Sequence, residues 1–291
     1  MFLDANDEID KKISEVFSAD TINSILPENI DYFGINVNVN TGEITLKTYY
    51  LEDYSFSLYE GKEDDSLIKF LKSKDMLLFF SVLKDSANSD KEIYEVKIRS
   101  RSNSNMLELF SIMEEDISFF SKYKDEIMKL AGMKNVTFEN RDYAAFYFFS
   151  IVKENSEIKT LKCYWDNNYK IENYDYFFKF LEESGVEKLQ ELLPITKTII
   201  NNCGGHLAFE GINYNKDCSE KHKIYLTDQN KDFYEGLIKT FPDNSEFHNS
   251  LKLIENWQDI HSEFYCDIFS IGTDDKGDYI INLYYKFTEE E

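Results

Sequence analysis

Apolar and polar residues alternate with the two-residue period of β-strands in ten short segments of this 291-residue chain. Short turn segments such as Asn40-Thr41-Gly42 join these segments in pairs. The pattern therefore predicts five antiparallel hairpins, at 33–39 with 43–51, 76–84 with 91–100, 143–153 with 157–166, 206–214 with 220–227, and 262–272 with 278–287.

Segments with the 3.6-residue period of amphipathic helices lie between the hairpins. We expect helices at 7–25, 64–73, 105–131, 175–183 and 187–202, and a last helical stretch at 231–257 that breaks near Pro242. The long helix at 105–131 is expected to stop at Gly132. Helices and hairpins thus alternate along the whole chain.

The second strand of each hairpin carries Lys-x-Tyr or a close variant. The copies read Ile44-Thr-Leu-Lys47-Thr-Tyr49, Ile93-Tyr-Glu95-Val-Lys97-Ile-Arg99, Thr160-Leu-Lys162-Cys-Tyr164, Lys221-His-Lys223-Ile-Tyr225 and Ile280-Ile-Asn282-Leu-Tyr284-Tyr-Lys286. Counted from Tyr49 through Arg99, Tyr164 and Tyr225 to Tyr284, successive copies are 50, 65, 61 and 59 residues apart. This period indicates one structural unit that is used five times.

Alternation gives each of these strands an aliphatic face and a cationic or phenolic face. In the third copy Lys162 and Tyr164 share one face, whereas Leu161 and Cys163 share the other. The amphipathic helices need an apolar sheet face to cover, so we expect the aliphatic face to look outward. Because closure removes exposed edges, ten antiparallel strands favour a barrel whose lumen is lined by lysine and tyrosine.

Such a lumen predicts the class of its ligand. Several lysines that converge in a partly dry interior repel one another unless an anion binds between them. If the sheet stays open, however, the same residues form an ordinary solvated face.

Composition narrows the range of partners. The chain has 55 Asp and Glu against 32 Lys and Arg, and its net charge of -23 argues against nucleic acid or an anionic membrane as a partner. No basic region precedes an apolar run at the N-terminus, and the longest apolar stretch, Met76 to Leu83, is too short to cross a bilayer. We expect a cytoplasmic protein that acts as a monomer, with reduced thiols at Cys163, Cys203, Cys218 and Cys266.

The hairpins with helical spacers, together with the phased Lys-x-Tyr, Lys-x-Lys-x-Tyr and Asn-x-Tyr-x-Lys strands, resemble the aromatic prenyltransferases of the ABBA, or PT-barrel, superfamily. The resemblance covers about residues 30–288 and implies an α+β fold, a ten-stranded antiparallel barrel of five α-β-β-α repeats with the helices outside. We expect one such domain over residues 1–291. The implied activity is transfer of a dimethylallyl or geranyl group from its diphosphate to an aromatic small molecule or peptide.

The resemblance also implies roles for the repeated residues. Cations and phenols would bind the diphosphate and stabilise the charge that grows on it as it leaves. The expected diphosphate-binding residues are Lys47, Lys97, Arg99, Lys162, Lys221, Lys223, Asn282 and Lys286. Aromatic rings would shield the allyl cation from water, and the expected catalytic residues are Tyr49, Tyr164, Tyr225 and Tyr284.

The base that removes the last proton stays open. Glu210 and Asp267 are candidates, and each is equally compatible with a solvated or hydrogen-bonded carboxylate. A lone strand histidine such as His206 is more often structural than catalytic. Asn36-Val-Asn38 stands where magnesium-dependent members of the family carry an aspartate, so the resemblance implies that lysines neutralise the diphosphate without a metal cofactor. The segment Asp274-Asp275-Lys-Gly-Asp278 has the letters of an Asp-rich metal motif, but its glycine favours a hairpin turn.

Two other functions stay open at this stage. The chain could be an acidic α/β interaction or immunity-type protein, or a related barrel that binds a lipid-like or phosphorylated ligand without chemistry. A closed lumen lined by lysine and tyrosine would favour the enzyme over the interaction protein.

Overall fold

The computed structural model of the protein describes residues 32–49, 73, 77–85, 93–99, 103–137, 146–154, 157–166, 182–183, 185–262, 264–274 and 276–287. They include ten strands that pair as the five predicted hairpins, whereas the turns at 86–92 and 155–156 lie outside the described residues. The strands are β1 (Tyr32–Asn38) with β2 (Ile44–Tyr49), β3 (Leu77–Asp85) with β4 (Ile93–Arg99), β5 (Phe146–Glu154) with β6 (Glu157–Asp166), β7 (Gly204–Asn215) with β8 (Glu220–Gln229), and β9 (Phe264–Thr273) with β10 (Tyr279–Phe287).

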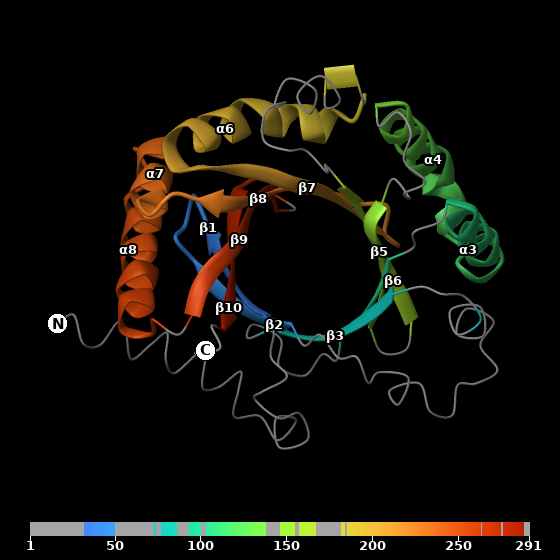
Figure 1. Ribbon diagram of the computed structural model, residues 1–291, viewed down its shortest axis with the longest axis horizontal. Helices are drawn as coiled ribbons and strands as arrows, with labels where there is room; N and C mark the ends of the chain where they lie inside the picture. Colours follow the sequence, from blue (N-terminus) through green and yellow to red (C-terminus); the bar gives the residue numbers. More distant parts are fainter. Residues whose placement is uncertain are drawn as a thin grey trace, which may run out of the picture.

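All ten strands are antiparallel to their neighbours, and each hairpin adjoins the next hairpin along the chain. Because β1 pairs with both β2 and β10, the strand order closes into a ring (Figure 1). Between the described residues of β2 and β3 the junction is short, with Lys47 opposite Asp85 and Thr48 opposite Lys84. The antiparallel sheet and its consecutive hairpins agree with the prediction from the sequence.

The helices lie outside the ring of strands (Figure 1). They are α3 (Asn103–Asp116) and α4 (Phe120–Thr137) after β4, α6 (Glu187–Cys203) before β7, and α7 (Phe233–Thr240) and α8 (Ser245–Ile260) before β9. The predicted helices at 7–25, 64–73 and 175–183 lie almost wholly outside the described residues. A complete α-β-β-α unit in every repeat therefore stays a prediction.

The single helix predicted at 105–131 is wrong, because α3 and α4 are separated by a turn at residues 117–119. In this turn the backbone N–H of Phe120 donates to the carbonyl oxygen of Ile117 at 3.0 Å. The turn gives the two helices different directions in Figure 1. It also brings the rings of Phe110 and Phe120 together, with 5.5 Å between their centroids, so aromatic packing links the two helices.

Two further helix ends differ in how well the sequence predicted them. Gly132 does not end the helix but lies inside α4, although an interior glycine costs about 1 kcal/mol relative to alanine. Burial of the apolar side of α4, including Ile127 and Leu130, offsets that cost. The break near Pro242 is confirmed, since α7 ends at Thr240 and α8 begins at Ser245.

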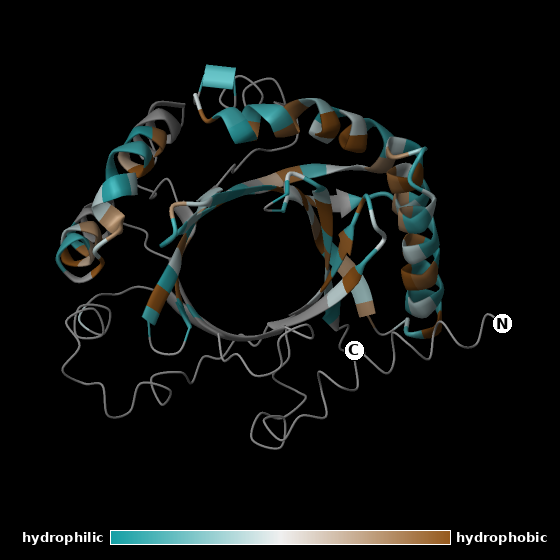
Figure 2. Cartoon of the chain, turned by 180° about the vertical axis from the view of Figure 1, so that it is seen from behind, coloured by the Kyte–Doolittle hydropathy of each residue, from teal (hydrophilic) through white to brown (hydrophobic). Residues whose placement is uncertain are grey.

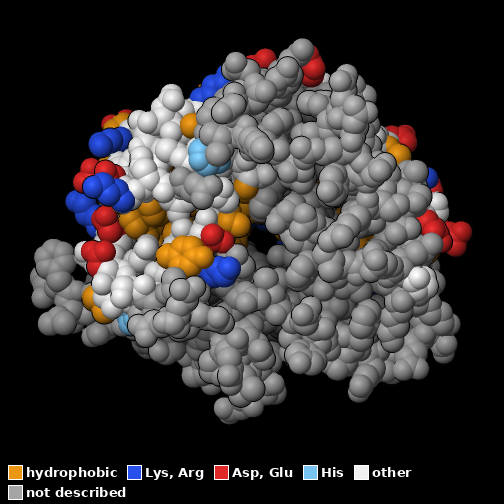
Figure 3. All heavy atoms as spheres, viewed as in Figure 1, with side chains coloured by type: hydrophobic (Ala, Val, Ile, Leu, Met, Phe, Trp, Pro, Cys, Tyr) orange, Lys and Arg blue, Asp and Glu red, His pale blue; other side chains and the backbone are white. Residues whose placement is uncertain are grey.

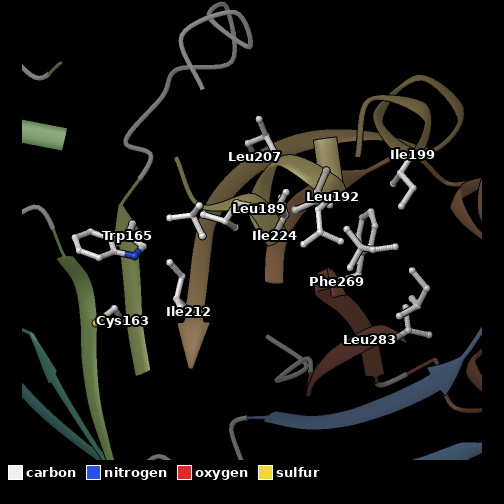
Figure 4. Packing of buried hydrophobic residues seen from close by; sticks show 14 of the residues in the cluster. Cys163, Trp165, Leu189, Leu192, Ile199, Leu207, Ile212, Ile224, Phe269 and Leu283 are labelled. Carbon is white, nitrogen blue, oxygen red and sulfur yellow. The ribbon is translucent and has the colours of Figure 1, made fainter. Parts of the chain in front are cut away.

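The main hydrophobic core lies between the strands and the surrounding helices. Leu189, Leu192 and Ile199 of α6 pack in one cluster with strand residues such as Ile224 and Phe269 (Figure 4). Seen from behind, the helices carry both hydrophobic and hydrophilic residues around their circumference (Figure 2). Burying each large aliphatic side chain contributes about 1.5–3 kcal/mol. The prediction that the aliphatic face of the strands looks outward is confirmed.

The segment that resembles an Asp-rich metal motif is the turn between β9 and β10, as predicted. The side-chain Oδ1 of Asp274 accepts hydrogen bonds from the backbone N–H groups of Lys276 at 2.8 Å and Asp278 at 2.9 Å. Gly277 has a φ of +87°, which L side chains rarely adopt. The Asp274 carboxylate therefore holds the turn.

Candidate active site

Every second strand residue belongs to the outer core, the hydrophobic core between the strands and the helices. The residues between them face the inside of the ring. Pairing across the strands aligns Asn36 with Asn282, Asn282 with Ser270, and Ser270 with Tyr225. Viewed in the direction of Figure 1, the molecular surface is hollowed near its centre. The described side chains beside this hollow include hydrophobic, acidic and basic ones (Figure 3). The predicted site residues on these strands thus border a common lumen.

Lys223 reaches across β9 to a residue on β10. Its Nζ atom donates a hydrogen bond to Oδ1 of Asn282 at 3.1 Å. The residue opposite Lys223 on β9 is Gly272, where a Cβ atom would lie 2.8 Å from Cγ of Lys223. Within the described part of the chain, the buried Nδ2 of Asn282 and Oγ of Ser270 have no hydrogen-bond partner. These polar atoms beside a lysine ammonium are suited to binding an anionic oxygen.

Lys162 forms an ion pair that the sequence did not reveal. Its Nζ atom lies 2.7 Å from Oε2 of Glu95 on β4, and the two side chains are 14% and 0% exposed. On β5, which lies between them, the residue opposite Lys162 is Ser150 and the residue opposite Glu95 is Val152, and both are buried. Glu95 shares the strand phase of Lys97, so alternation alone could have indicated that its carboxylate faces the lumen.

Three of the four predicted tyrosines form a continuous wall. The ring centroids of Tyr164 and Tyr225 are 5.9 Å apart, and those of Tyr225 and Tyr284 are 6.0 Å apart. Gly211 lies under the rings of Tyr164 and Tyr225. A Cβ atom at Gly211 would be 3.0 Å from Cε2 of Tyr225 and 3.4 Å from Cδ1 of Tyr164. Burial raises the pKa of the Tyr164 phenol well above its usual range, and the Glu95 carboxylate raises it further. Tyr164 therefore stays a neutral hydrogen-bond donor near pH 7.

Two other predicted lysines, Lys221 and Lys286, lie farther along β8 and β10 from the contact between Lys223 and Asn282. Lys221 precedes Lys223 by two residues of β8, about 7 Å along the strand. Lys286 follows Asn282 by four residues of β10, about 13 Å, and lies opposite Tyr265. The structure therefore does not bring Lys286 together with Lys223.

For the remaining predicted residues the structure describes the backbone alone. Lys47 pairs with Gly34 and Asp85, and Tyr49 pairs with Tyr32. On β4, Lys97 lies opposite Ser150, and Arg99 lies opposite Leu77. The pairing of Ser150 with both Lys97 and Lys162 puts Lys97 in register with Lys162 across β5.

The structure rules out one candidate base. Glu210 pairs with Trp165 and Ile224, which both belong to the outer core, and it is fully buried there. A β-bulge between Leu207 and Phe209 precedes it. Glu210 thus faces the helices and cannot reach a ring in the lumen.

The other two uncertain residues lie at irregular or terminal parts of their strands. Asp267 occupies the bulge where the β9–β10 register shifts between Tyr284 and Tyr285. His206 lies opposite Thr227 near the start of β7 and is partly exposed. Neither position supports a choice of base.

The described residues form neither a metal site nor a membrane-spanning helix. No group of three or more His, Cys, Asp or Glu side chains among them is arranged to hold a metal ion. None of the helices in the described ranges is long and apolar enough to span a membrane.

The protein resembles solved structures in fold and not in sequence. No family model matches the chain, and no curated protein sequence matches it. The structure of NotF in complex with brevianamide F and DMSPP matches with a TM-score of 0.63 and 13% identity, over 92% of this chain and 82% of that one. AnaPT from Neosartorya fischeri matches with a TM-score of 0.55 and 10% identity, over 90% and 80%.

A third match is a 6-dimethylallyl tryptophan synthase, with a TM-score of 0.56 and 9% identity over 87% of this chain and 79% of that one. Identities this low show a shared fold and nothing finer. The matches nevertheless extend over most of each chain and agree with the ring of hairpins inside a layer of helices. The chain therefore has the fold of the ABBA-type aromatic prenyltransferases.

Proposed function

We propose that the protein is an aromatic prenyltransferase, which transfers a dimethylallyl or geranyl group from its diphosphate to an aromatic acceptor. The observation that carries the proposal is the position of Lys162 and Lys223 on the lumen side of the strands, beside the wall of Tyr164, Tyr225 and Tyr284. The NotF complex with brevianamide F and DMSPP supports a lumen that holds two ligands together. The proposal takes residues 1–291 as one catalytic domain.

The lysines act on the leaving group. When the bond between the allylic carbon and oxygen breaks, its electron pair stays with the diphosphate, whose negative charge then increases. Ammonium groups held inside the lumen stabilise that charge more in the transition state than in the ground state. Asn282 holds Nζ of Lys223 over the lumen, and Lys162 and Lys221 supply further positive charge. We take Lys47, Lys97 and Arg99 as further members of this set, whereas Lys286, about 13 Å along β10 from Asn282, would lie too far from Lys223 to bind the same phosphate group.

The tyrosine wall acts on the allyl cation. The faces of Tyr164, Tyr225 and Tyr284 stabilise a cation next to them and keep water away from it. Tyr49 would extend the wall. The acceptor ring forms a bond to the cationic carbon and then loses the proton from the attacked position to a base.

We also propose that the reaction needs no metal ion, because the lysines take the place of magnesium at the diphosphate. A chelator should then leave the rate of prenyl transfer unchanged, and added magnesium should not raise it. Complete loss of activity with a chelator, restored by magnesium, would overturn this part of the proposal.

The experiment is a screen with five-, ten- and fifteen-carbon allylic diphosphates against phenols, indoles and aromatic peptides, analysed by mass spectrometry. Prenylation should appear with at least one pair and should disappear in a Lys162→Met, Lys223→Met double variant that still folds. Binding of a non-hydrolysable allylic thiodiphosphate without transfer to any acceptor would favour a barrel that binds its ligand without chemistry. If the protein neither binds the thiodiphosphate nor transfers a prenyl group, the proposed prenyltransferase function is wrong.

A further inference from the structure

The Glu95–Lys162 pair spans a strand that lies between its two members. Glu95 is on β4 and Lys162 is on β6, so the side chains meet over β5, across about 10 Å of sheet. The contact is diagonal across β5, since Lys162 lies opposite Ser150 and Glu95 lies opposite Val152. The contact between Nζ and Oε2 is 2.7 Å, which is a charge-assisted hydrogen bond.

The pair places a negative charge where the proposed function requires positive charge. The Glu95 carboxylate is buried, and it is close enough to Tyr164 to raise the pKa of that phenol. It therefore lies at the junction of the lysines and the tyrosine wall. Nζ of Lys162, which would bind an oxygen of the diphosphate, already binds an oxygen of Glu95.

We propose, on the basis of the function proposed above, that Glu95 competes with the diphosphate for Lys162. When the anion binds, the hydrogen bond from Nζ to Oε2 breaks and a hydrogen bond from Nζ to a phosphate oxygen replaces it. The carboxylate stays buried beside a polyanion, and their repulsion weakens the retention of the anion. No proton or covalent bond changes place in this exchange.

The competition has a consequence for turnover. Lysines that stabilise the leaving group also bind the inorganic diphosphate that remains after transfer, and product release limits the rate of many enzymes. A carboxylate that recaptures Lys162 speeds that release. Glu95 is thus a positioning residue, which acts on the substrate and the product through Lys162.

Titration calorimetry with inorganic pyrophosphate tests the competition without any acceptor. Glu95→Gln keeps the size of the side chain and an oxygen that can accept from Lys162, but it removes the charge. This variant should bind pyrophosphate more tightly, by on the order of tenfold, whereas Lys162→Met should bind it more weakly. In the double variant most of the gain should be lost, because there is no Lys162 to release.

The exposed pair Glu235–Lys239 on α7 supplies a matched control. Its N···O distance is 3.6 Å, and the side chains of Lys239 and Glu235 are 66% and 68% exposed. Glu235→Gln changes the net charge by the same amount as Glu95→Gln but should leave the pyrophosphate affinity unchanged. If Glu95→Gln does not fold, Glu95→Asp replaces it; its shorter side chain should weaken the ion pair and tighten binding by a smaller factor.

The outcomes separate the competition from the function on which it rests. If neither the wild type nor Glu95→Gln binds pyrophosphate, the anion site of the proposed function is wrong. If the wild type binds and Glu95→Gln binds equally or more weakly, the competition is wrong and the anion site stands. A gain that persists in full in the double variant would also overturn the competition, because it would reflect repulsion that does not involve Lys162.

Discussion

Lys223 of β8 donates a hydrogen bond to Asn282 of β10 at 3.1 Å, and the side chain of Lys223 crosses β9 at a glycine, Gly272. The asparagine oxygen fixes the ammonium group above the middle of three strands and adds no negative charge of its own. A carboxylate in place of the asparagine would satisfy the same hydrogen bond but would cancel that charge. The arrangement therefore positions the Lys223 ammonium group at β9 without placing a carboxylate at Asn282.

Lys223→Met should weaken the binding of inorganic pyrophosphate by roughly 10- to 100-fold, because a hydrogen bond to a charged group contributes about 1.5–3 kcal/mol. Methionine keeps most of the aliphatic length, so the melting temperature should change little. Calorimetry measures the affinity, and Lys239→Met on the outer surface of α7 provides the control. Equal affinity for the wild type and Lys223→Met would show that the anion does not bind at Lys223.

Gly272→Ala should reduce both stability and anion affinity. The added Cβ would lie 2.6 Å from the carbonyl oxygen of His222 and 2.8 Å from Cγ of Lys223, so β8 must move. We expect a loss of about 1–3 kcal/mol in the free energy of unfolding, measured by urea denaturation, together with weaker pyrophosphate binding.

Gly277→Asn in the turn between β9 and β10 is the control for Gly272→Ala. Nothing lies within 4 Å of a Cβ atom at Gly277, and asparagine tolerates its positive φ better than other residues do. An unchanged free energy of unfolding in Gly272→Ala would mean that β8 and β9 adapt without cost.

The direction of a strand side chain could be predicted because it depends on the residue itself and its neighbours. Lys162 faces the lumen and Cys163 is buried in the outer core, as their alternation indicated. The helix break before α8 was also a local signal, since Pro242 cannot continue a helix.

Contacts between distant strands could not be predicted in this way. Glu95 and Lys162 are 67 residues apart, and their contact depends on the register of β4, β5 and β6. Glu210 was a poor candidate base because a bulge precedes it and its strand phase points to the helices. The turn at residues 117–119 contains no proline or glycine, so the sequence carries no local signal for it. The turn depends on how α3 packs against α4.

The four thiols should differ sharply in reactivity. Burial raises the pKa of Cys203 to about 12 and the pKa values of Cys163 and Cys266 well above their usual range, whereas Cys218 is exposed. A raised pKa leaves almost no thiolate, the reactive form, and burial blocks the reagent as well. At about pH 8 a thiol reagent should therefore modify one cysteine rapidly and the other three only after denaturation.

The variant Cys218→Ser should abolish the rapid phase and leave the slow one. Raising the pH by about one unit should not make the three buried thiols reactive, because their pKa values stay above the pH of the experiment and the thiols stay protonated. Rapid modification of Cys163 or Cys266 would show that these thiols are accessible, and it would contradict their burial in the outer core.

Tyr225 is the central ring of the tyrosine wall, so its removal should open the path of water to the allyl cation. With dimethylallyl diphosphate as donor, Tyr225→Leu should release a larger fraction of the prenyl group as the alcohol and should slow diphosphate consumption by roughly 2- to 30-fold, since one cation–π contact contributes about 0.5–2 kcal/mol. Tyr225→Phe keeps the ring and should keep the low fraction of alcohol. Tyr265→Leu changes a tyrosine that is 37% exposed and lies outside the wall, so it should behave as the wild type. Chromatography with mass spectrometry measures both products, and an unchanged ratio in Tyr225→Leu would exclude a shielding role for this ring.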